Sequence, residues 1–350
     1  MAGQTNMLKY ILKRLLIMIP TLFGVLILIF IMPRMLVGDP TMFMFPMDIP
    51  EEVRNAEIAR LGLDQPWYIQ LGVYLRNFFI GDWGESYLGR SAGYEVLDWM
   101  ELMIPRTIQL TFIPMVFVPI LGVKLGVTSA VNQDKPVDTF IRGISVAGMA
   151  FPLFWTGMIF RVLSGITLRI FTNGEFWLPT FGFKLAHLDD PTPVTNFRII
   201  DCILANEQLL LYDTLQHLVL PVLCITWVSL AGISRITRSS MLDVLEQDYI
   251  RTARAKGCLE NTVINKHALR NAMIPTSNLI IGGIAGSLTG SMIIEQTFNM
   301  YGLGMSMFYA ITYLDYWMIT GIALFIAVIV LLANLSADIM YTIIDPRIVY

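Results

Sequence analysis

The chain has 350 residues, of which 55% are hydrophobic and only 15% are charged. An average soluble domain carries roughly 25% charged residues, so this composition argues against a soluble globular protein. The net charge of −3, from 24 basic and 27 acidic residues, gives no indication of a nucleic-acid partner.

Six windows without a charged residue follow one another along the chain. A membrane core about 30 Å thick is crossed by about 20 apolar residues of helix, which is close to the length of each window. The sequence therefore predicts an all-α membrane protein with six transmembrane helices, over residues 15–33, 107–123, 143–160, 218–234, 272–294 and 318–337.

The N-terminal segment, residues 1–14, carries Lys9, Lys13 and Arg14 and no acidic residue. Positive charge near the end of a span favours the cytoplasmic side, so this segment is placed in the cytoplasm. A signal peptide has an apolar region of only about 7–15 residues. The first window is longer than that, and we expect it to remain in the protein as a membrane helix.

The charges of the connecting segments agree with this orientation. Residues 34–104, which six spans place outside, contain eleven acidic residues and five arginines. Residues 235–271, which fall inside, contain seven basic and four acidic residues. Positive charge concentrates on the cytoplasmic side of membrane proteins. Both termini, including the tail 345–350, are therefore predicted to be cytoplasmic, and the outer segments 34–104 and 172–213 are expected to form short amphipathic helices and loops at the lipid surface.

Cysteine and histidine are too scattered to predict a metal site, a disulfide or a catalytic group. Three of each occur, in separate parts of the chain, and no zinc-protease, hydrolase or phosphate-binding-loop motif is present. We therefore expect no enzyme activity, no metal and no cofactor bound by this chain.

The segment between the fourth and fifth predicted spans has the pattern of a compact projection. Leu245, Tyr249 and Ala253 recur on one face of a predicted helix. Gly257 is expected to end that helix, because glycine takes the left-handed conformation without steric cost. A second short helix is expected to follow. Two such helices joined by a glycine would form a knob that docks on another protein, and the alternative is an amphipathic loop on the lipid surface.

The same segment resembles the permease subunits of ABC importers of the dipeptide, oligopeptide and nickel class, of the first-permease type. The matching residues are Tyr249–Gly257 (YIRTARAKG) and His267–Pro275 (HALRNAMIP). Further motifs at the family's positions are Tyr10–Leu15, Gly38–Pro40, Gly62–Pro66, Gly81–Ser86, Pro105–Thr107, Glu295–Phe298, Gly302–Gly304, Asp315–Tyr316 and Asp345–Ile348. Two departures are Arg251-Thr252-Ala253, where the general importer motif has Glu-Ala-Ala, and Trp317, where the family usually has proline.

This resemblance implies a six-span permease of the inner membrane with its core over residues 105–344. It implies a homologous second permease, two ABC ATPase subunits that hold ATP and Mg²⁺, and an extracytoplasmic substrate-binding protein as partners, besides membrane lipid. It also implies that the loop coupling to the ATPases includes Tyr249, Arg251, Thr252, Ala253, Arg254, Ala255, Lys256, Gly257, His267, Leu269, Arg270 and Asn271.

Residues of a pore or gate are predicted in the last third of the chain. Gly283, Gly286 and Gly290 allow close helix contact in the fifth span, which either simple packing or a sliding pore seam explains. Glu295 and Asp315 belong to the family motifs and complete this set.

Two other classes of function remain as alternatives. A secondary transporter would carry ionisable residues in mid-membrane, and the six windows contain none. A membrane enzyme would need a clustered catalytic constellation. The cargo of an importer is predicted to be a peptide, with an oligosaccharide or a nickel chelate as alternatives.

Overall fold

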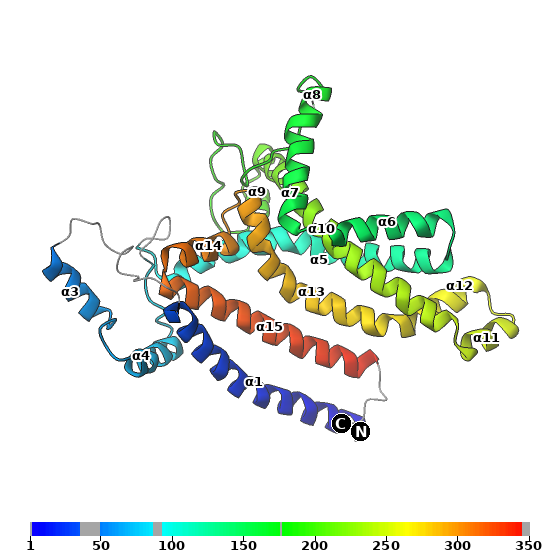
Figure 1. Cartoon of the computed structure of the whole chain (residues 1–350), viewed down its shortest axis with the longest axis horizontal. Coiled ribbons are helices and arrows are strands. Elements are labelled where there is room, and N and C mark those ends of the chain that lie inside the picture. The colour runs from blue at the N-terminus through cyan, green and yellow to red at the C-terminus, as the bar shows by residue number, and fades with distance from the viewer. Residues whose placement is uncertain (1, 36–49, 87–92, 176, 345–350) are drawn as a thin grey trace. The chain divides into compact units, whose positions relative to one another are not determined.

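The computed structural model of the protein describes residues 2–35, 50–86, 93–175 and 177–344, and within these ranges the regular structure is helical (Figure 1). The chain divides into two compact units. The first unit contains the described residues of 1–106 and 301–331, and the second contains those of 107–300 and 332–350. The predicted tail 345–350 and the Gly38–Pro40 motif lie outside the described residues.

The first unit is built on two long apolar helices, α1 (Ala2–Met35) and the start of α15 (Tyr316–Ile344). Leu26 and Leu324 are buried where these helices meet. The shorter helices α3 (Glu51–Arg60) and α4 (Trp67–Ile80) lie between them in sequence, and α4 contacts the last turns of α1. The contacts include Phe30 with Tyr74, whose ring centroids are 5.5 Å apart.

A second core of this unit joins the start of α5 (Val96–Val131) to α14 (Leu303–Tyr313) and α15. The indole of Trp99 donates a hydrogen bond to Ser306 Oγ at 3.0 Å. The turn between α14 and α15 places Leu314 at φ +59°, so that the amide of Asp315 bonds back to the carbonyl of Ala310 at 2.9 Å. A leucine in this region costs conformational energy, and its burial in the core offsets that cost.

The second unit is a bundle around the long helix α10 (Gln208–Leu245). Helices α6 (Pro136–Ala150), α7 (Leu153–Val162) and α13 (Leu269–Thr297) pack against it. The remaining short elements of the unit are the π-helix η2 (Leu163–Leu168), α8 (Arg169–Phe171), α9 (Arg198–Leu204), α11 (Asp248–Ala255), α12 (Glu260–Thr262) and the π-helix η3 (Val263–Ala268).

The predicted third span, residues 143–160, is not one helix. The chain leaves α6 at Ala150, is extended at Phe151 and Pro152, and enters α7 at Leu153. Proline removes a backbone donor and disfavours helix at the residue before it, which explains the break. A helix long and apolar enough to cross a membrane runs instead from Leu153 to Phe171.

Five helices of the described chain have the length and composition of a membrane span: Leu12–Met35, Val96–Val131, Leu153–Phe171, Gln208–Leu245 and Tyr316–Ser336. They correspond to the first, second, third, fourth and sixth predicted spans, the third with shifted bounds. The predicted fifth span, 272–294, lies within α13, where several side chains are outside the described residues.

Candidate functional site

The segment predicted to couple to ATPases lies in the second unit, between α10 and α13. It consists of α11, a turn at Gly257, and the short elements α12 and η3 (Figure 1). These last two continue without interruption into α13, so the second predicted short helix is the beginning of the helix that carries the predicted fifth span. We call the exposed side of residues 248–261 the α11 surface.

The sequence of α11 determines both of its ends. Asp248 lies in its first turn and Arg254 in its last, which complements the helix dipole. After the helix, Gly257 has φ +77°, which confirms the predicted left-handed conformation. The amide of Gly257 bonds to the carbonyl of Arg254 at 2.9 Å, and the amide of Cys258 bonds to the carbonyl of Ala253 at 3.2 Å. This pair of bonds is a Schellman motif, which satisfies carbonyls that the helix end would leave open.

One side chain, Ile250, anchors α11 to the rest of the unit. It is fully buried and lies in one apolar cluster with Met241 of α10, Val263 and Ala268 of η3, and Ala272 of α13. Burying an isoleucine contributes roughly 1.5–3 kcal/mol, which holds so short a helix in place.

The residues predicted to share one helix face, Leu245, Tyr249 and Ala253, do not lie on one helix, because Leu245 is the last residue of α10 and α11 begins at Asp248. Leu245 and Ala253 still pack against the cluster that contains Ile250, whereas Tyr249 is 42% exposed. Its hydroxyl accepts a hydrogen bond from Asn271 Nδ2 at 2.7 Å, which links α11 to the start of α13. Two residues predicted from separate motifs, Tyr249 and Asn271, are thus brought together.

An ion pair closes the turn at Gly257. Arg254 donates from Nε to Glu260 Oε2 at 3.2 Å and from Nη2 to Oε1 at 2.6 Å. The hydrogen bonds from Arg254 lower the pKa of the Glu260 carboxyl. Because both side chains are exposed, this pair orients the turn more than it stabilises the fold.

The other predicted coupling residues divide by exposure. Ala253, His267 and Leu269 are half-buried, and the exposed ones are Tyr249, Arg251, Thr252, Arg254, Ala255, Lys256, Gly257, Arg270 and Asn271. Sequence reasoning missed Leu259, which is 77% exposed at the tip of the turn. The α11 surface therefore carries an apolar side chain beside exposed cations.

A buried carboxylate that the sequence did not single out lies near the foot of α10. Asp138, in the first turn of α6, is fully buried and receives Nε and Nη2 of Arg238 at 2.7 and 2.8 Å. Ser129 Oγ and the amide of Asp134 also donate to it. The hydrogen bonds from Arg238 hold the pKa of Asp138 well below its usual value. An acid in the first turn of a helix is ordinary, so the spacing alone gives no signal of this network.

The close helix contacts of the second unit are made by glycines other than the predicted ones. A Cβ on Gly126 of α5 would lie 2.5 Å from Thr237 Cβ and 2.7 Å from the carbonyl of Ser234, both in α10. A Cβ on Gly122, one turn earlier, would lie 2.7 Å from Ile233. Residues 122–126 form a GxxxG pattern, the sequence signal that could have located this contact.

The predicted glycines of the fifth span are open. No atom outside the helix lies within 4 Å of a Cβ built on Gly283 or Gly286. Gly290 belongs to α13, but its surroundings lie outside the described residues. Among the described residues, neither Gly283 nor Gly286 therefore makes a close contact with another helix, and both are exposed.

The two predicted pore acids are buried and hold hydrogen bonds. Glu295, in the second unit, accepts from Thr107 Oγ1 at 2.7 Å. Asp315, in the first unit, accepts from Ser86 Oγ at 2.6 Å and from the amide of Met318 at 3.1 Å. The second bond makes Asp315 a cap for the start of α15. In the described structure each acid joins elements of its own unit.

No group of three or more histidine, cysteine or acidic side chains that could hold a metal ion occurs among the described residues.

Comparison with known proteins identifies the family of this chain. The profile of a family described as "binding-protein-dependent transport system inner membrane component" matches residues 122–350. The chain belongs to this family.

Individual relatives extend the similarity to nearly the whole chain. The di/tripeptide transport system permease protein DppB of Pseudomonas aeruginosa (strain UCBPP-PA14) is 36% identical over 98% of this chain and 99% of its own length. The oligopeptide transport system permease protein AppB of Bacillus subtilis (strain 168) and the glutathione transport system permease protein GsiC of Escherichia coli O1:K1 are each 35% identical over 98% of this chain and 100% of their own lengths.

Family membership establishes an inner-membrane, multi-pass permease component of an ABC transport system. Such a component is not itself catalytic, and it works with other components of the transporter. It is also the class of function predicted from the sequence, rather than the ion-driven secondary transporter or the membrane enzyme.

Proposed function

We propose that this chain forms half of the translocation pore of an ATP-driven importer for small peptides. The observation that carries the proposal is similarity over 98% of the chain to permeases named for di- and tripeptides, for oligopeptides and for glutathione, which is itself a peptide. These names favour a peptide cargo over the oligosaccharide or nickel chelate that the sequence left open.

The α11 surface is the proposed contact with the ATPase subunits. Three features support this role: the buried anchor Ile250, the left-handed turn at Gly257 and the Arg254–Glu260 pair. Together they hold the exposed helix α11 in a fixed orientation ahead of the N-terminal end of α13. A contact that passes movement of the ATPases on to the membrane helices needs such rigidity, because a flexible loop would absorb the displacement.

The remaining partners are proposed on the same family basis. A homologous second permease would complete the pore, two ABC ATPases would bind ATP and Mg²⁺, and an extracytoplasmic binding protein would deliver the peptide. In this assembly both termini and the α11 surface lie in the cytoplasm, and residues 34–104 and 172–213 lie outside. Gly283, Gly286, Gly290, Glu295 and Asp315 remain the proposed pore or gate residues.

Reconstitution into liposomes tests the proposal. The complete transporter should take up labelled dialanine only when ATP and the binding protein are both supplied. The purified chain alone should hydrolyse no ATP. Peptide uptake by this chain alone, driven by a proton gradient without the ATPases, would instead establish a secondary transporter.

A further inference from the structure

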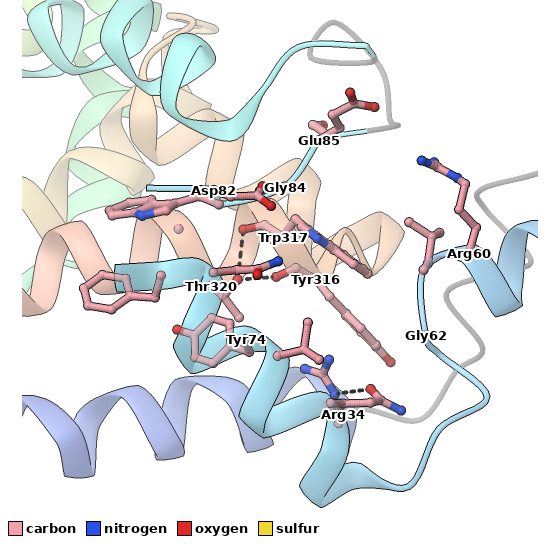
Figure 2. Close-up of a pocket in the computed structure, with 18 of the residues that line it drawn as sticks. Arg34, Arg60, Gly62, Tyr74, Asp82, Gly84, Glu85, Tyr316, Trp317 and Thr320 are labelled. Carbon is pink, nitrogen blue, oxygen red and sulfur yellow. Dashed lines mark hydrogen bonds between the residues drawn. The ribbon is translucent and has the colours of Figure 1, made fainter. Parts of the chain in front are cut away.

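Two features of the described chain have no part in the proposed function. The first is a cavity of about 610 Å³ in the first unit. Two arginines that line it, Arg34 and Arg60, lie apart and do not converge on one point (Figure 2), so the cavity by itself indicates no ligand. The second is the buried ion pair of Asp138 and Arg238 in the second unit, whose hydrogen bonds are closely converging.

This ion pair holds α6 against both α5 and α10. Arg238 of α10 donates from Nε to Asp138 Oδ1 at 2.7 Å and from Nη2 to Oδ2 at 2.8 Å. Ser129, near the end of α5, donates to the same carboxylate through its hydroxyl. Two parallel bonds from a planar guanidinium fix a direction as well as a distance. We call the side chains of Ser129, Asp138 and Arg238 the Asp138 clamp.

The Asp138 clamp lies next to the residues that bury Ile250 of α11. Ala130 follows Ser129 on α5, and Met241 lies one turn after Arg238 on α10. Both Ala130 and Met241 belong to the apolar cluster that contains Ile250. A shift of α5 or α10 at the clamp would therefore displace the contacts that hold α11.

The same turn of α10 also contacts α13, the helix that continues from the coupling segment. Thr237, directly before Arg238, shares a hydrogen bond of 3.3 Å with Thr276 of α13, and both hydroxyls are buried. On α5, a Cβ built on Gly126 would lie 2.5 Å from Thr237 Cβ. Through the two successive residues Thr237 and Arg238, α10 thus contacts α5, α6 and α13.

Stability alone does not require an ion pair at this place. Taking two charges out of water costs free energy that their attraction only partly returns, so apolar residues of similar volume are often as stable or more stable. Here the Asp138 side chain is 0% exposed and that of Arg238 is 18% exposed. A bidentate pair is satisfied in one relative position of its helices, so it contributes direction where apolar side chains would permit sliding.

We propose that the Asp138 clamp positions α11 for coupling, so that movement of the ATPases is passed on to α5, α6, α10 and α13 together. This inference rests on the proposed function. Asp138 and Arg238 are positioning residues, because they act through the contacts of Ile250 rather than through the exposed α11 surface. In a transporter without the clamp the ATPases still bind, but each hydrolysed ATP moves the membrane helices less.

The number of labelled dialanine molecules imported for each ATP hydrolysed, measured with the complete transporter in liposomes, tests this role. A smaller folded fraction lowers uptake and hydrolysis together. A displaced α11 instead lowers the uptake obtained from each ATP. The ratio therefore separates positioning from a merely structural role.

Two variants alter the clamp in different ways. Arg238→Lys keeps the charge but replaces the bidentate contact by a point charge. The triple variant Ser129→Ala, Asp138→Leu, Arg238→Met makes the site apolar, and its unfolding midpoint should equal or exceed that of the wild type. We expect the ratio to fall about threefold in Arg238→Lys and about tenfold in the triple variant, as for other residues that carry coupling.

Two further measurements serve as controls. Arg235→Lys, at an exposed arginine one turn earlier on α10, should leave the ratio unchanged. The amount of ATPase that co-purifies should be the same for the wild type and both clamp variants, because the α11 surface itself is unaltered.

A wild-type ratio in a triple variant that is as stable as the wild type would overturn the proposal. If the triple variant is less stable, Arg238→Lys decides, and a wild-type ratio there overturns the proposal. Loss of co-purifying ATPase in Arg238→Lys would also overturn it, because the clamp would then serve docking. A wild-type transporter that imports no dialanine with ATP and the binding protein would refute the proposed function, and this inference with it.

Discussion

At the scale of single residues, Asp138 connects three helices of the second unit. It lies in α6, its partner Arg238 is in α10, and Ser129 is near the end of α5. The Arg238 side chain is 18% exposed, whereas that of Asp138 is fully buried. Removing a buried partner is costly because the remaining charge is left without compensation.

Replacing Asp138 by asparagine should therefore destabilise the chain by about 2 kcal/mol or more. The midpoint of thermal unfolding in detergent should fall by several degrees. Asp243→Asn, an exposed position on α10, is the matched control and should change it little. Equal midpoints for Asp138→Asn and the control would show that this ion pair does not hold the helices together.

The pH dependence of this effect follows from the lowered pKa of Asp138. A carboxylate whose pKa is lower in the folded state than its unfolded value of about 3.9 stabilises the protein above that value, and the stabilisation is lost as the pH falls through the folded pKa. The difference in unfolding midpoint between wild type and Asp138→Asn should thus be the same at about pH 7.5 and about pH 5.5. A difference that shrinks between these conditions would contradict the lowered pKa.

Gly257 provides a test of the α11 surface. No other atom lies within 4 Å of a Cβ built there, so a substitution acts through the backbone, at a cost of roughly 1 kcal/mol or more for valine at positive φ. We expect the Gly257→Val variant to insert in the membrane. Less ATPase subunit should co-purify with it than with the wild type, and the transporter that contains it should import less peptide. Ala255→Ser, at the exposed last residue of α11, should have a smaller effect. Wild-type recovery and uptake in Gly257→Val would return this segment to the role of a surface loop.

At the scale of elements, the contact between α5 and α10 depends on the absence of side chains. Gly126→Ala would force a methyl group against a backbone carbonyl, and overpacking of this kind costs about 1–3 kcal/mol. Gly282→Ala on α13 meets no atom within 4 Å and should be neutral or slightly stabilising, because alanine favours helix. Thermal unfolding of the two variants measures the difference, and equal midpoints would contradict the close approach at Gly126.

Five of the six predicted spans fall within single helices of the described chain, although their ends differ, and the third runs across the break between α6 and α7. The charge-free windows stop at the first charged residue, whereas α10 continues past Arg235 and Arg238 to Leu245, and Arg238 pairs there with Asp138. The third window passed through Pro152, since proline carries no charge. A search for charge-free windows detects neither partners distant in sequence nor local breaks of the backbone.

The candidate site was predictable where a residue type alone determines the conformation. Gly257 is of this kind, since positive φ selects glycine. The burial of Ile250 was not predictable in this way, because it depends on how α11 is rotated relative to Met241 and Ala272. Likewise, the glycines of α13 that have no atom nearby and those of α5 that touch α10 are the same residue type. They differ only in whether another helix approaches them, which the sequence does not show.

At the scale of the whole molecule, the orientation in the membrane can be tested with the chain's own cysteines. Cys202 and Cys224 are buried, whereas Cys258 is exposed on the α11 surface. In intact cells Cys258 should resist a thiol reagent that cannot cross the membrane. A cysteine introduced at the exposed Asp189, in a chain with Cys258→Ser, should react. Labelling of both from the same side would refute the proposed topology.

The continuity of α12, η3 and α13 has a mechanical consequence. From Glu260 to Thr297 the chain is one helical rod, on the order of 55 Å long at 1.5 Å per residue. A tilt of about 5° around one end of such a rod moves the other end by about 5 Å. The π-helical turn at Val263–Ala268 and Pro275 each disturb the regular hydrogen-bond ladder, so bending of the rod would concentrate at these two places. In the proposed importer, the uninterrupted remainder from Thr276 to Thr297 would carry a displacement from its α11 end to Glu295.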